Sequence, residues 1–558
     1  MPNPIDQLFA QRDALLDQMK SIDRLRRGTL SRQVFTKKQA GQTVTQGPYF
    51  ILQSFHHGKK FSQRIPAQAA ERIQEQVGNF KQFQALADQC ISLTDLITQL
   101  TEGLPGSKKK LQSSEVQTEQ FRETQGFLRL VREDFIRQGV GNLEAIELGL
   151  RQALLQDGRC LLEQLLQQAE GSLDDNTSRP GEKCHQERTK PVHTIFGEIT
   201  LCRRYFYRAA SHTGRAPLDE ALGLVNGFSP GLVRLSARAA AREGYEAASQ
   251  DLLDLAGIRI EGRQIQRLVN QIGPDIAAQL TQGETPKPDK IPVMYIEVDG
   301  TGVPMVADEL AGRKGKQPDG TAKTREIKLG SIFTQSRCDE AGRPQRDYAS
   351  TTYVGSFEAA DVFGLRVREE ARRRGLGRAH KVVFIGDGAP WIWELRRVNF
   401  PDAIEILDLY HALEHLHLLC DGLYGPQHPW ALKMETTWTE MLKNDQVADV
   451  IASARRRLKD LGPEADDTLA KQILYFERHQ HRMLYKSYRQ AGLFYGSGVV
   501  EAGCKAVIGQ RLKNSGMFWT ESGARNVLNL RCALKSNRWN ECWDRLYDSN
   551  RLKFRAAA

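Results

Sequence analysis

The chain has 558 residues, and this length predicts about three or four domains. Hydrophobic residues make up 40% of the sequence, which is enough to build folded cores and excludes a wholly disordered protein. The formal net charge of +10 favours a polyanionic partner, although a basic but ordinary enzyme would show the same balance.

Cysteine usage and hydropathy exclude two further classes of protein. The 9 cysteines are odd in number and never form a Cys-x-x-Cys pair, which argues against a disulfide framework and against a zinc ribbon. The first residues contain no apolar signal-peptide segment, and the chain has no run of about 18 apolar residues. We therefore expect a cytoplasmic protein without a membrane span.

The first 192 residues have mainly helical patterns. Residues 1–103 open and close with helical periodicity around a basic, glycine-punctuated stretch that contains the strand-like run YFILQSF (49–55). The Gly-, Ser- and Lys-rich residues 104–115 predict a linker, and residues 116–192 form a further helical region that ends in a polar, turn-rich stretch. The sequence thus predicts an accessory N-terminal domain.

Residues 193–282 combine a predicted β-hairpin at 193–209 with two amphipathic helices around a turn at Gly257. This spacing is typical of a helix-turn-helix whose second helix, 261–272, would read DNA base edges. Paired helices around a glycine turn are also common in proteins that bind no DNA, so the pattern alone leaves both interpretations open. The side chains expected on the exposed face of the second helix are Arg263, Gln264 and Arg267.

From residue 291 the pattern changes to strands. Three strand-like runs are followed by the order helix, strand, helix, strand, which predicts a mixed α/β domain rather than a simple alternating sheet. Residues 411–490 are helical throughout, and another helix begins near 497. The expected strands lie at 291–306, 325–334, 346–356, 381–388 and 403–412.

Two of these strands end in an aspartate on a glycine turn. Asp299 follows the run MYIEV, Asp387 follows KVVFIG, and an acid in this position faces a crevice rather than the core. Each could instead simply cap the turn that follows. Together they suggest an oxygen-ligand site for a divalent cation, with Glu501 after the turn GSG as a third carboxylate. The alternative for Glu501 is an acid that merely favours the first turn of a helix.

Four blocks of the sequence resemble the DDE transposases of the ISKra type, a mutator-related family of bacterial insertion sequences. The blocks are EVDGTGVPM (297–305), IGDGAPWIW (385–393), LDLYHALEHL (407–416) and GSGVVEAGCKAVIGQRLKNSGMFWTESGARNVLNLR (496–531). The resemblance implies an RNase H-like core in two parts, 291–410 and 496–550, with an all-helical insertion at 411–495. It also implies that residues 1–103 are a fused domain of unknown function.

By this resemblance Asp299, Asp387 and Glu501 are the catalytic triad and hold Mg²⁺ or Mn²⁺. Asp408 and His411 form an Asp-x-x-His pattern similar to a signature of mutator-like transposases, which implies a role at the active site. Without the resemblance, this pair is a structural cap followed by a histidine on a helix surface.

Several residues near the triad have two interpretations. Glu297 and Glu326 are alternatives to Asp299 as the first acid, and Lys505 could either pair with Glu501 or neutralise a phosphate. An aromatic side chain of the helical insertion, Trp430 or Trp438, would stack on an unpaired base. The basic residues expected to contact DNA phosphates are Lys505, Arg511 and Lys513.

The implied function is binding of terminal inverted repeats and target DNA, followed by metal-dependent strand cleavage and strand transfer. Pairing two DNA ends implies a homo-oligomer, at least a dimer, associated with the bacterial nucleoid. The alternatives are an RNase H-like nuclease without strand transfer and a non-catalytic DNA-binding protein derived from a transposase. Only Cys184 and Cys202 lie near the block where relatives carry a zinc-knuckle-like set, so we expect no structural zinc there.

Overall fold

The computed structural model divides the chain into two compact units, residues 1–113 and residues 114–558. Among the described residues, no helix has the length and apolar character needed to cross a membrane. The predicted linker at 104–115 lies outside the described residues. Those described are 4–39, 42–56, 59–101, 121–138, 142–170, 173, 177–282, 290–315, 317–461 and 467–556.

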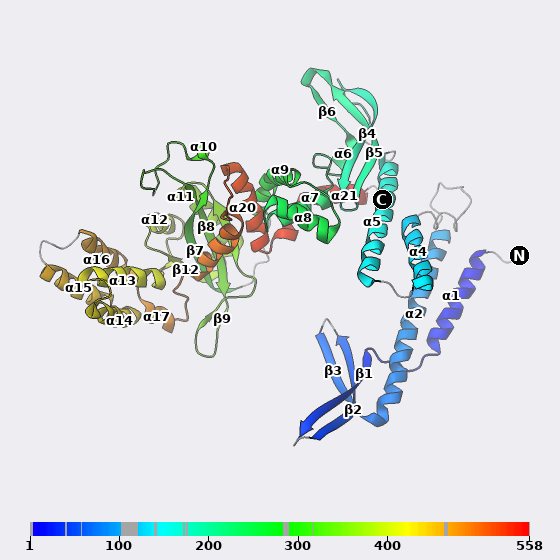
Figure 1. The fold of residues 1–558 in the computed structure, drawn as a ribbon, viewed down its shortest axis with the longest axis horizontal. Helices are drawn as coiled ribbons and strands as arrows, with labels where there is room; N and C mark the ends of the chain where they lie inside the picture. The colour runs from blue at the N-terminus through cyan, green and yellow to red at the C-terminus, as the bar shows by residue number, and fades with distance from the viewer. Residues whose placement is uncertain are drawn as a thin grey trace. The chain divides into compact units, whose positions relative to one another are not determined.

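The first unit consists of two helices and a three-stranded antiparallel sheet with the strand order β1-β2-β3 (Figure 1). The run YFILQSF lies in the central strand β2, and the two outer strands were not expected because their sequences are basic and polar. Leu52 and Ile65 of the sheet pack with Ile73 and Val77 of α2. The elements are α1 (Pro4–Lys20), β1 (Thr29–Gln39), β2 (Gln42–His56), β3 (Lys59–Ile65), η1 (Ala67–Ala69) and α2 (Ala70–Thr101).

The second unit begins with two helices and a β-hairpin. The hairpin starts at Lys183, ten residues before the sequence-based start at 193, because β4 is a polar strand that gains its order by pairing with β5. Helix α5 packs on this hairpin, and Glu170 accepts a hydrogen bond of 2.8 Å from the Arg204 amide. The elements are α4 (Arg122–Gln138), α5 (Leu143–Glu170), β4 (Lys183–Thr194), β5 (Gly197–Arg208), η2 (Ala209–Ser211) and β6 (Thr213–Arg215).

A cluster of short helices follows, and it contains the two helices expected around Gly257. Gly257 ends α8 with a φ of 69°, a left-handed conformation that glycine adopts without strain. Helix α9 then begins at Gly262 and continues to Thr281, nine residues beyond the predicted end at 272. The helices are α6 (Pro217–Ala221), α7 (Pro230–Ala240), α8 (Tyr245–Ala256) and α9 (Gly262–Thr281).

A five-stranded sheet with the strand order β11-β8-β7-β12-β13 forms the centre of the second unit. Strand β8 pairs antiparallel with both β11 and β7, whereas β12 runs parallel to both β7 and β13. The prediction of a mixed α/β domain is confirmed. The strands are β7 (Ile291–Pro304), β8 (Thr324–Gln335), β11 (Thr352–Ser356), β12 (Ala379–Gly386) and β13 (Ile404–Leu407), and a small hairpin pairs β9 (Arg337–Cys338) with β10 (Pro344–Gln345).

Helices cover both faces of this sheet (Figure 1). On one face Val367 of α11 lies against Gly330 of β8, and on the other Leu528 of α20 lies against Gly355 of β11. The glycines allow these close approaches because they carry no side chain. The helices are α10 (Ala307–Leu310), α11 (Ala360–Arg373), η3 (Leu376–Arg378), α12 (Pro390–Asn399), α20 (Glu521–Lys535) and α21 (Trp539–Ala556).

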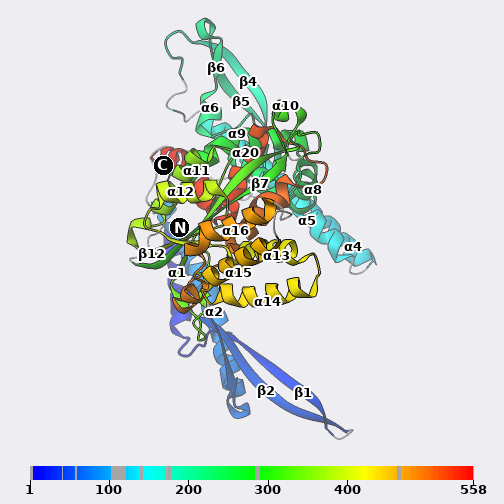
Figure 2. The ribbon, with the colours of Figure 1, turned by 90° about the vertical axis from the view of Figure 1, so that its left-hand side faces the viewer.

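The chain between β13 and the last helices forms a helical segment, residues 409–490, whose helices α13 to α16 gather into one bundle (Figure 2). Trp393 of α12 contacts His479 of α16, so the bundle packs against a helix of the sheet domain. Its helices are α13 (Leu409–Tyr424), α14 (Pro429–Lys443), α15 (Val447–Leu461), α16 (Asp467–His479), η5 (Gln480–Arg482) and α17 (Tyr485–Gln490). The chain then continues through α18 (Gly498–Gly503), the π-helical turn η6 (Cys504–Gly509) and α19 (Gln510–Leu512).

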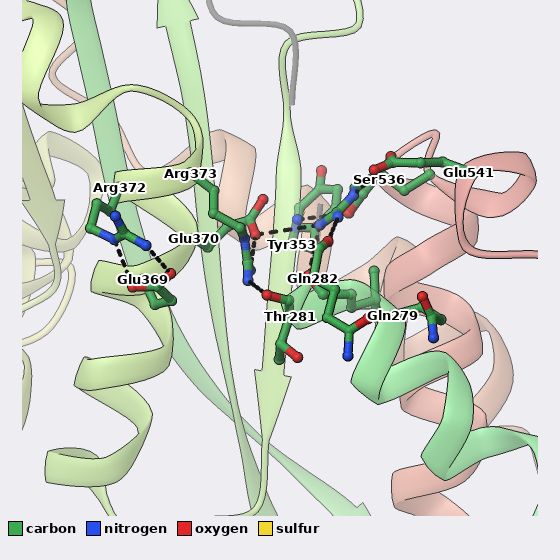
Figure 3. A network of polar contacts seen from close by, with 12 residues as sticks. Gln279, Thr281, Gln282, Tyr353, Glu369, Glu370, Arg372, Arg373, Ser536 and Glu541 are labelled. Carbon is green, nitrogen blue, oxygen red and sulfur yellow. Dashed lines mark hydrogen bonds and ion pairs between the residues drawn. The ribbon is translucent and has the colours of Figure 1, made fainter. Parts of the chain in front are cut away.

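A buried polar network fixes the end of α9 to the sheet domain (Figure 3). Arg373 of α11 donates to the carbonyl of Thr281 and to the Glu370 carboxylate. Arg538, just before α21, donates to the carbonyl of Gln282 at 3.1 Å and to Glu370 at 3.5 Å. Glu370 and Arg538 are both buried, and each has a second partner of opposite charge, Arg373 for Glu370 and Glu541 for Arg538. Helix α9 is therefore held by α11 and the C-terminal helices.

Candidate active site

The parallel strands β7 and β12 bring two predicted catalytic acids together. Asp387 directly follows the end of β12, but Asp299 lies within β7, which continues to Pro304, so the glycine turn predicted after Asp299 is wrong. The strands are parallel, and Ile385 pairs with Glu297. Two residues further along this register, Asp387 stands opposite Asp299. Both aspartates therefore lie where the parallel pairing of β7 with β12 ends.

Asp299 is half-buried and has two hydrogen-bond donors. Its Oδ1 accepts a bond of 2.6 Å from the Gly300 amide, and the Cys504 thiol also donates to it. Burial raises the pKa of Asp299 and the negative charge of Asp387 adds to the rise, so the pKa lies above its ordinary value despite those bonds. Repulsion between these two carboxylates is the condition that a bound cation relieves.

Asp387 is held by its own turn. Its Oδ1 accepts a hydrogen bond of 2.8 Å from the Ala389 amide, just before α12 begins at Pro390. The turn-capping interpretation is therefore also present in the structure. Capping occupies one carboxylate oxygen and fixes the direction of the other, which is compatible with a ligand role.

Glu501 lies in the first turn of α18 and is linked to Asp408. Its Oε1 accepts a hydrogen bond of 2.9 Å from the Ser497 hydroxyl, and the Ser497 amide donates to Asp408 Oδ2. Asp408 is fully buried, and its Oδ1 caps α13 by accepting from the His411 amide at 2.9 Å. This geometry makes Asp408 a residue that positions Glu501, and it does not place Asp408 where substrate would bind.

His411 is half-exposed and surrounded by acids. Its Nδ1 lies 3.3 Å from Glu414 Oε2. Burial lowers the pKa of His411, but the charges of Asp408 and Asp387 and the hydrogen bond with Glu414 together raise it above the ordinary value. His411 is therefore protonated over a wider pH range than a free histidine, next to the Asp387 turn.

Glu297, which the sequence analysis treated only as an alternative to Asp299, is fully buried. Its Oε2 accepts a hydrogen bond of 2.7 Å from the Val500 amide and one of 3.4 Å from the Ser331 hydroxyl. Burial, followed by the charges of Asp408 and Glu501, raises the pKa of Glu297 to about 8. Glu297 thus joins β7 to the start of α18, a role that its spacing of two residues from Asp299 could have suggested.

The other alternative acid, Glu326, lies away from the carboxylates. Its Oε2 forms an ion pair of 2.9 Å with Lys328 on the same strand, and it faces Gly300 across the β7–β8 pair.

The carboxylates have the right chemistry for a hard cation but no complete ligand set. Asp299, Asp387 and Glu501 offer oxygen ligands from three elements, as Mg²⁺ and Mn²⁺ prefer. Within the described parts of the chain, however, no three His, Cys, Asp or Glu side chains lie close enough together to hold a metal ion. A metal site here would need the three side chains to close around the ion.

The residues expected to contact DNA fall into two groups. Arg263, Arg267 and Lys505 are exposed, and Lys513 is exposed with its Nζ donating to the Thr301 hydroxyl. Gln264 is engaged locally, because its side chain accepts from the Glu261 amide at 3.2 Å in a capping box at the start of α9. No ion pair between Lys505 and Glu501 occurs among the described residues.

Two predicted DNA contacts are wrong because their side chains are buried. Arg511 has no exposed surface: its Nε donates to the Ala240 carbonyl at 2.7 Å, and its guanidinium lies 4.9 Å from the centres of the Tyr245 and Trp519 rings. Trp438 is 1% exposed and packs in the core of the helical segment. Neither side chain presents a surface to a phosphate or a base. Trp430, the other aromatic that the sequence analysis considered, is 53% exposed.

The two cysteines near the predicted hairpin form no metal cluster in the described chain. Cys184 and Cys202 are both free thiols, and the Cys202 thiol lies 3.7 Å from Glu187 Oε2.

Comparison with known proteins places most of the second unit in one family. The sequence profile of the Uncharacterised protein family (UPF0236) matches residues 137–541. The chain belongs to this family. A relative described as "UPF0236 protein in vanSb 3′ region", from Streptococcus gallolyticus, is 22% identical over 387 residues, which cover 67% of this chain and 79% of the relative. A solved structure, the Drosophila P element transposase strand transfer complex, aligns with a TM-score of 0.23 and 9% identity over 58% of this chain and 82% of that chain.

Proposed function

We propose that this member of the UPF0236 family is a DDE transposase with an RNase H-like core. The observation that carries the proposal is the register of β7 and β12, whose continuation beyond Ile385 and Glu297 brings Asp387 to Asp299. Glu501, held by Ser497, is the third acid that the proposal adds. The sheet order supports the core assignment, because three antiparallel strands followed by two parallel ones match the order that the family resemblance implies.

In this proposal the three carboxylates of Asp299, Asp387 and Glu501 hold Mg²⁺ or Mn²⁺ at the end of the sheet. A divalent cation would supply activation of the attacking oxygen and stabilisation of the leaving one. Cleavage is attack of water on a phosphodiester, which breaks the bond to the 3′ oxygen and releases a 3′-hydroxyl. In strand transfer that hydroxyl attacks a target phosphodiester and displaces the 3′ oxygen of the target strand, which leaves as a hydroxyl, so no covalent protein intermediate is required.

The remaining residues of the site orient the Glu501 carboxylate or neutralise negative charge on the DNA. Asp408 and Glu297 fix the start of α18 through Ser497 and Val500, which determines where the Glu501 carboxylate points. His411, whose pKa is raised, would carry a positive charge that neutralises a phosphate oxygen near Asp387.

The partners in the proposal are double-stranded DNA, as terminal inverted repeats and target, and a second copy of the chain. Exposed Arg263 and Arg267 on α9 support a DNA-reading role for the helix pair α8–α9. The basic net charge of +10 agrees with a nucleic-acid partner in the bacterial nucleoid.

A strand-transfer assay with precleaved element ends tests the proposal directly. Wild-type protein with Mg²⁺ should join these ends to target DNA, and Asp299→Asn should abolish joining while still binding DNA. Asp402→Asn, at an exposed aspartate before β13, is the matched control and should join ends normally. Cleavage without joining would instead identify an RNase H-like nuclease, and DNA binding with neither activity would identify a non-catalytic DNA-binding protein.

A further inference from the structure

A cavity with basic lining residues lies on the face of the β7–β8 pair opposite to Asp299. A cavity of about 890 Å³ opens there between the end of this strand pair, residues 313–315, 317 and 322–323, and Phe357. Its volume corresponds to about thirty water molecules, which is far more than one phosphate group occupies. The cavity therefore has room for a segment of an extended ligand.

Cationic side chains dominate the lining of this cavity. Five lining residues are cationic and one, Glu326, is acidic. Two of the cations are already paired, since Arg325 contacts Glu309 and Glu521 and Lys328 contacts Glu326. The other three are Arg313, Lys314 and Lys323, which are exposed and form no ion pair within 4.0 Å among the described residues.

Side chains of β8 lie over the part of β7 that lines this cavity. Gly300 and Gly302 are two residues apart on β7 and so face the same side, which is the side opposite Asp299. A Cβ atom on Gly300 would lie 2.4 Å from Glu326 Oε1, and one on Gly302 would lie 2.7 Å from Thr324 Oγ1. Glu326 and Thr324 therefore already occupy the space above these two glycines, so the cationic side chains are what the cavity offers to a ligand.

We infer that this cavity binds the phosphodiester backbone of DNA outside the reaction centre, an inference that rests on the proposed function. Three exposed cations without an ion pair in one cavity suit a polyanion held through its phosphates, which positions a duplex without reading its sequence. Asp299 lies on the opposite face of the same strand, so DNA held here is anchored next to the carboxylates and makes no contact with them through this cavity.

The salt dependence of DNA binding tests this inference. Binding of a fluorescent random-sequence duplex is measured by anisotropy without divalent metal, for wild type and for the triple variant Arg313→Ala, Lys314→Ala and Lys323→Ala. Loss of three phosphate contacts should lower the slope of log Kd against log salt by about 3. Between about 50 and about 200 mM salt, wild type should then lose about 40-fold more affinity than the variant.

A matched control lies at the opposite end of β8. Arg337, Arg343 and Arg346 are three exposed arginines in and beside the β9–β10 hairpin, roughly 36 Å away along the strand by the ordinary rise per residue. Their joint replacement by Ala removes the same charge and should leave the salt slope near that of wild type. Circular dichroism of both variants checks that they fold.

Two results would overturn the inference: an unchanged slope in the cavity variant, or an equal fall in the control variant. Failure of the proposed function is separate. If the cavity variant shows the smaller slope but wild type neither cleaves nor joins DNA, the anchoring site stands and the transposase proposal falls. If wild type joins DNA ends and the cavity variant keeps the full slope, only the anchoring site falls.

Discussion

Acid should destabilise the helical segment through one histidine of α16. His479 is 6% exposed, its Nδ1 lies 2.8 Å from Arg482 Nη1, and its ring lies 4.9 Å from the ring of Tyr475. Burial, and then the charge of Arg482, lower the pKa of His479 from 6.5 to about 4. The folded protein therefore keeps this ring neutral at pH values where the unfolded chain protonates it.

The sign of the effect follows from proton binding. Between pH 6.5 and about 4 the unfolded state binds a proton that the folded state does not, so the free energy of unfolding falls as the pH falls through this range. These two pKa values give a loss of about 2 kcal/mol between about pH 7 and about pH 5.

Urea unfolding monitored by tryptophan fluorescence at both pH values measures this loss. His479→Asn keeps an acceptor for Arg482 but does not titrate, so its loss of stability on acidification should be smaller than that of wild type by about 2 kcal/mol. His380→Asn, at an exposed histidine of β12, controls for the removal of one histidine. Equal losses in wild type and His479→Asn would refute the reasoning.

Three further substitutions test the site and its surroundings. Ser497→Ala removes the donor to Glu501 and should lower activity or metal affinity about 10- to 100-fold with little change in stability, as a metal titration would show. Gly388→Ala would place a Cβ atom 2.1 Å from the Tyr475 ring and should cost about 1–3 kcal/mol, measured as a fall in unfolding free energy that Tyr475→Ala partly restores. Arg511→Met removes a buried, hydrogen-bonded guanidinium and should cost about 2 kcal/mol or more in thermal unfolding, while the salt slope of DNA binding stays unchanged.

The sequence was informative where the strands are apolar. The runs before Asp299 and Asp387 are continuous and hydrophobic because β7 and β12 lie inside the sheet, covered on both faces. After β12 a glycine turn does mark the end of the strand, whereas β7 continues through Gly300 and Gly302 to Pro304, so the turn expected after Asp299 is wrong. That the two strands are adjacent and in register is a property of the sheet, which no local pattern encodes.

Polar segments with long-range partners could not be predicted in this way. Strand β4 has the sequence KCHQERTKPVHT, which shows little apolar alternation, and its order comes from pairing with β5. The local sequence suggests that Arg511 is a surface cation, because the acceptor of its Nε–H, the carbonyl of Ala240, is 271 residues away in the chain. In both cases the contact that orders the residues is made with another part of the chain, and the local sequence does not show it.

The position of Glu501 depends on the two places where the chain enters and leaves the helical segment, rather than on the helices between them. The residues that flank the helical segment meet each other: the Ser497 amide donates to Asp408, and the Leu409 amide donates to the Tyr495 carbonyl at 3.1 Å. The chain thus leaves the sheet domain and returns to it at the same place. The entropic cost of closing such a loop grows only slowly with its length. The outer helices of the segment can therefore change without moving the carboxylate, whereas any change where the chain enters or leaves the segment shifts the turn that orients Glu501.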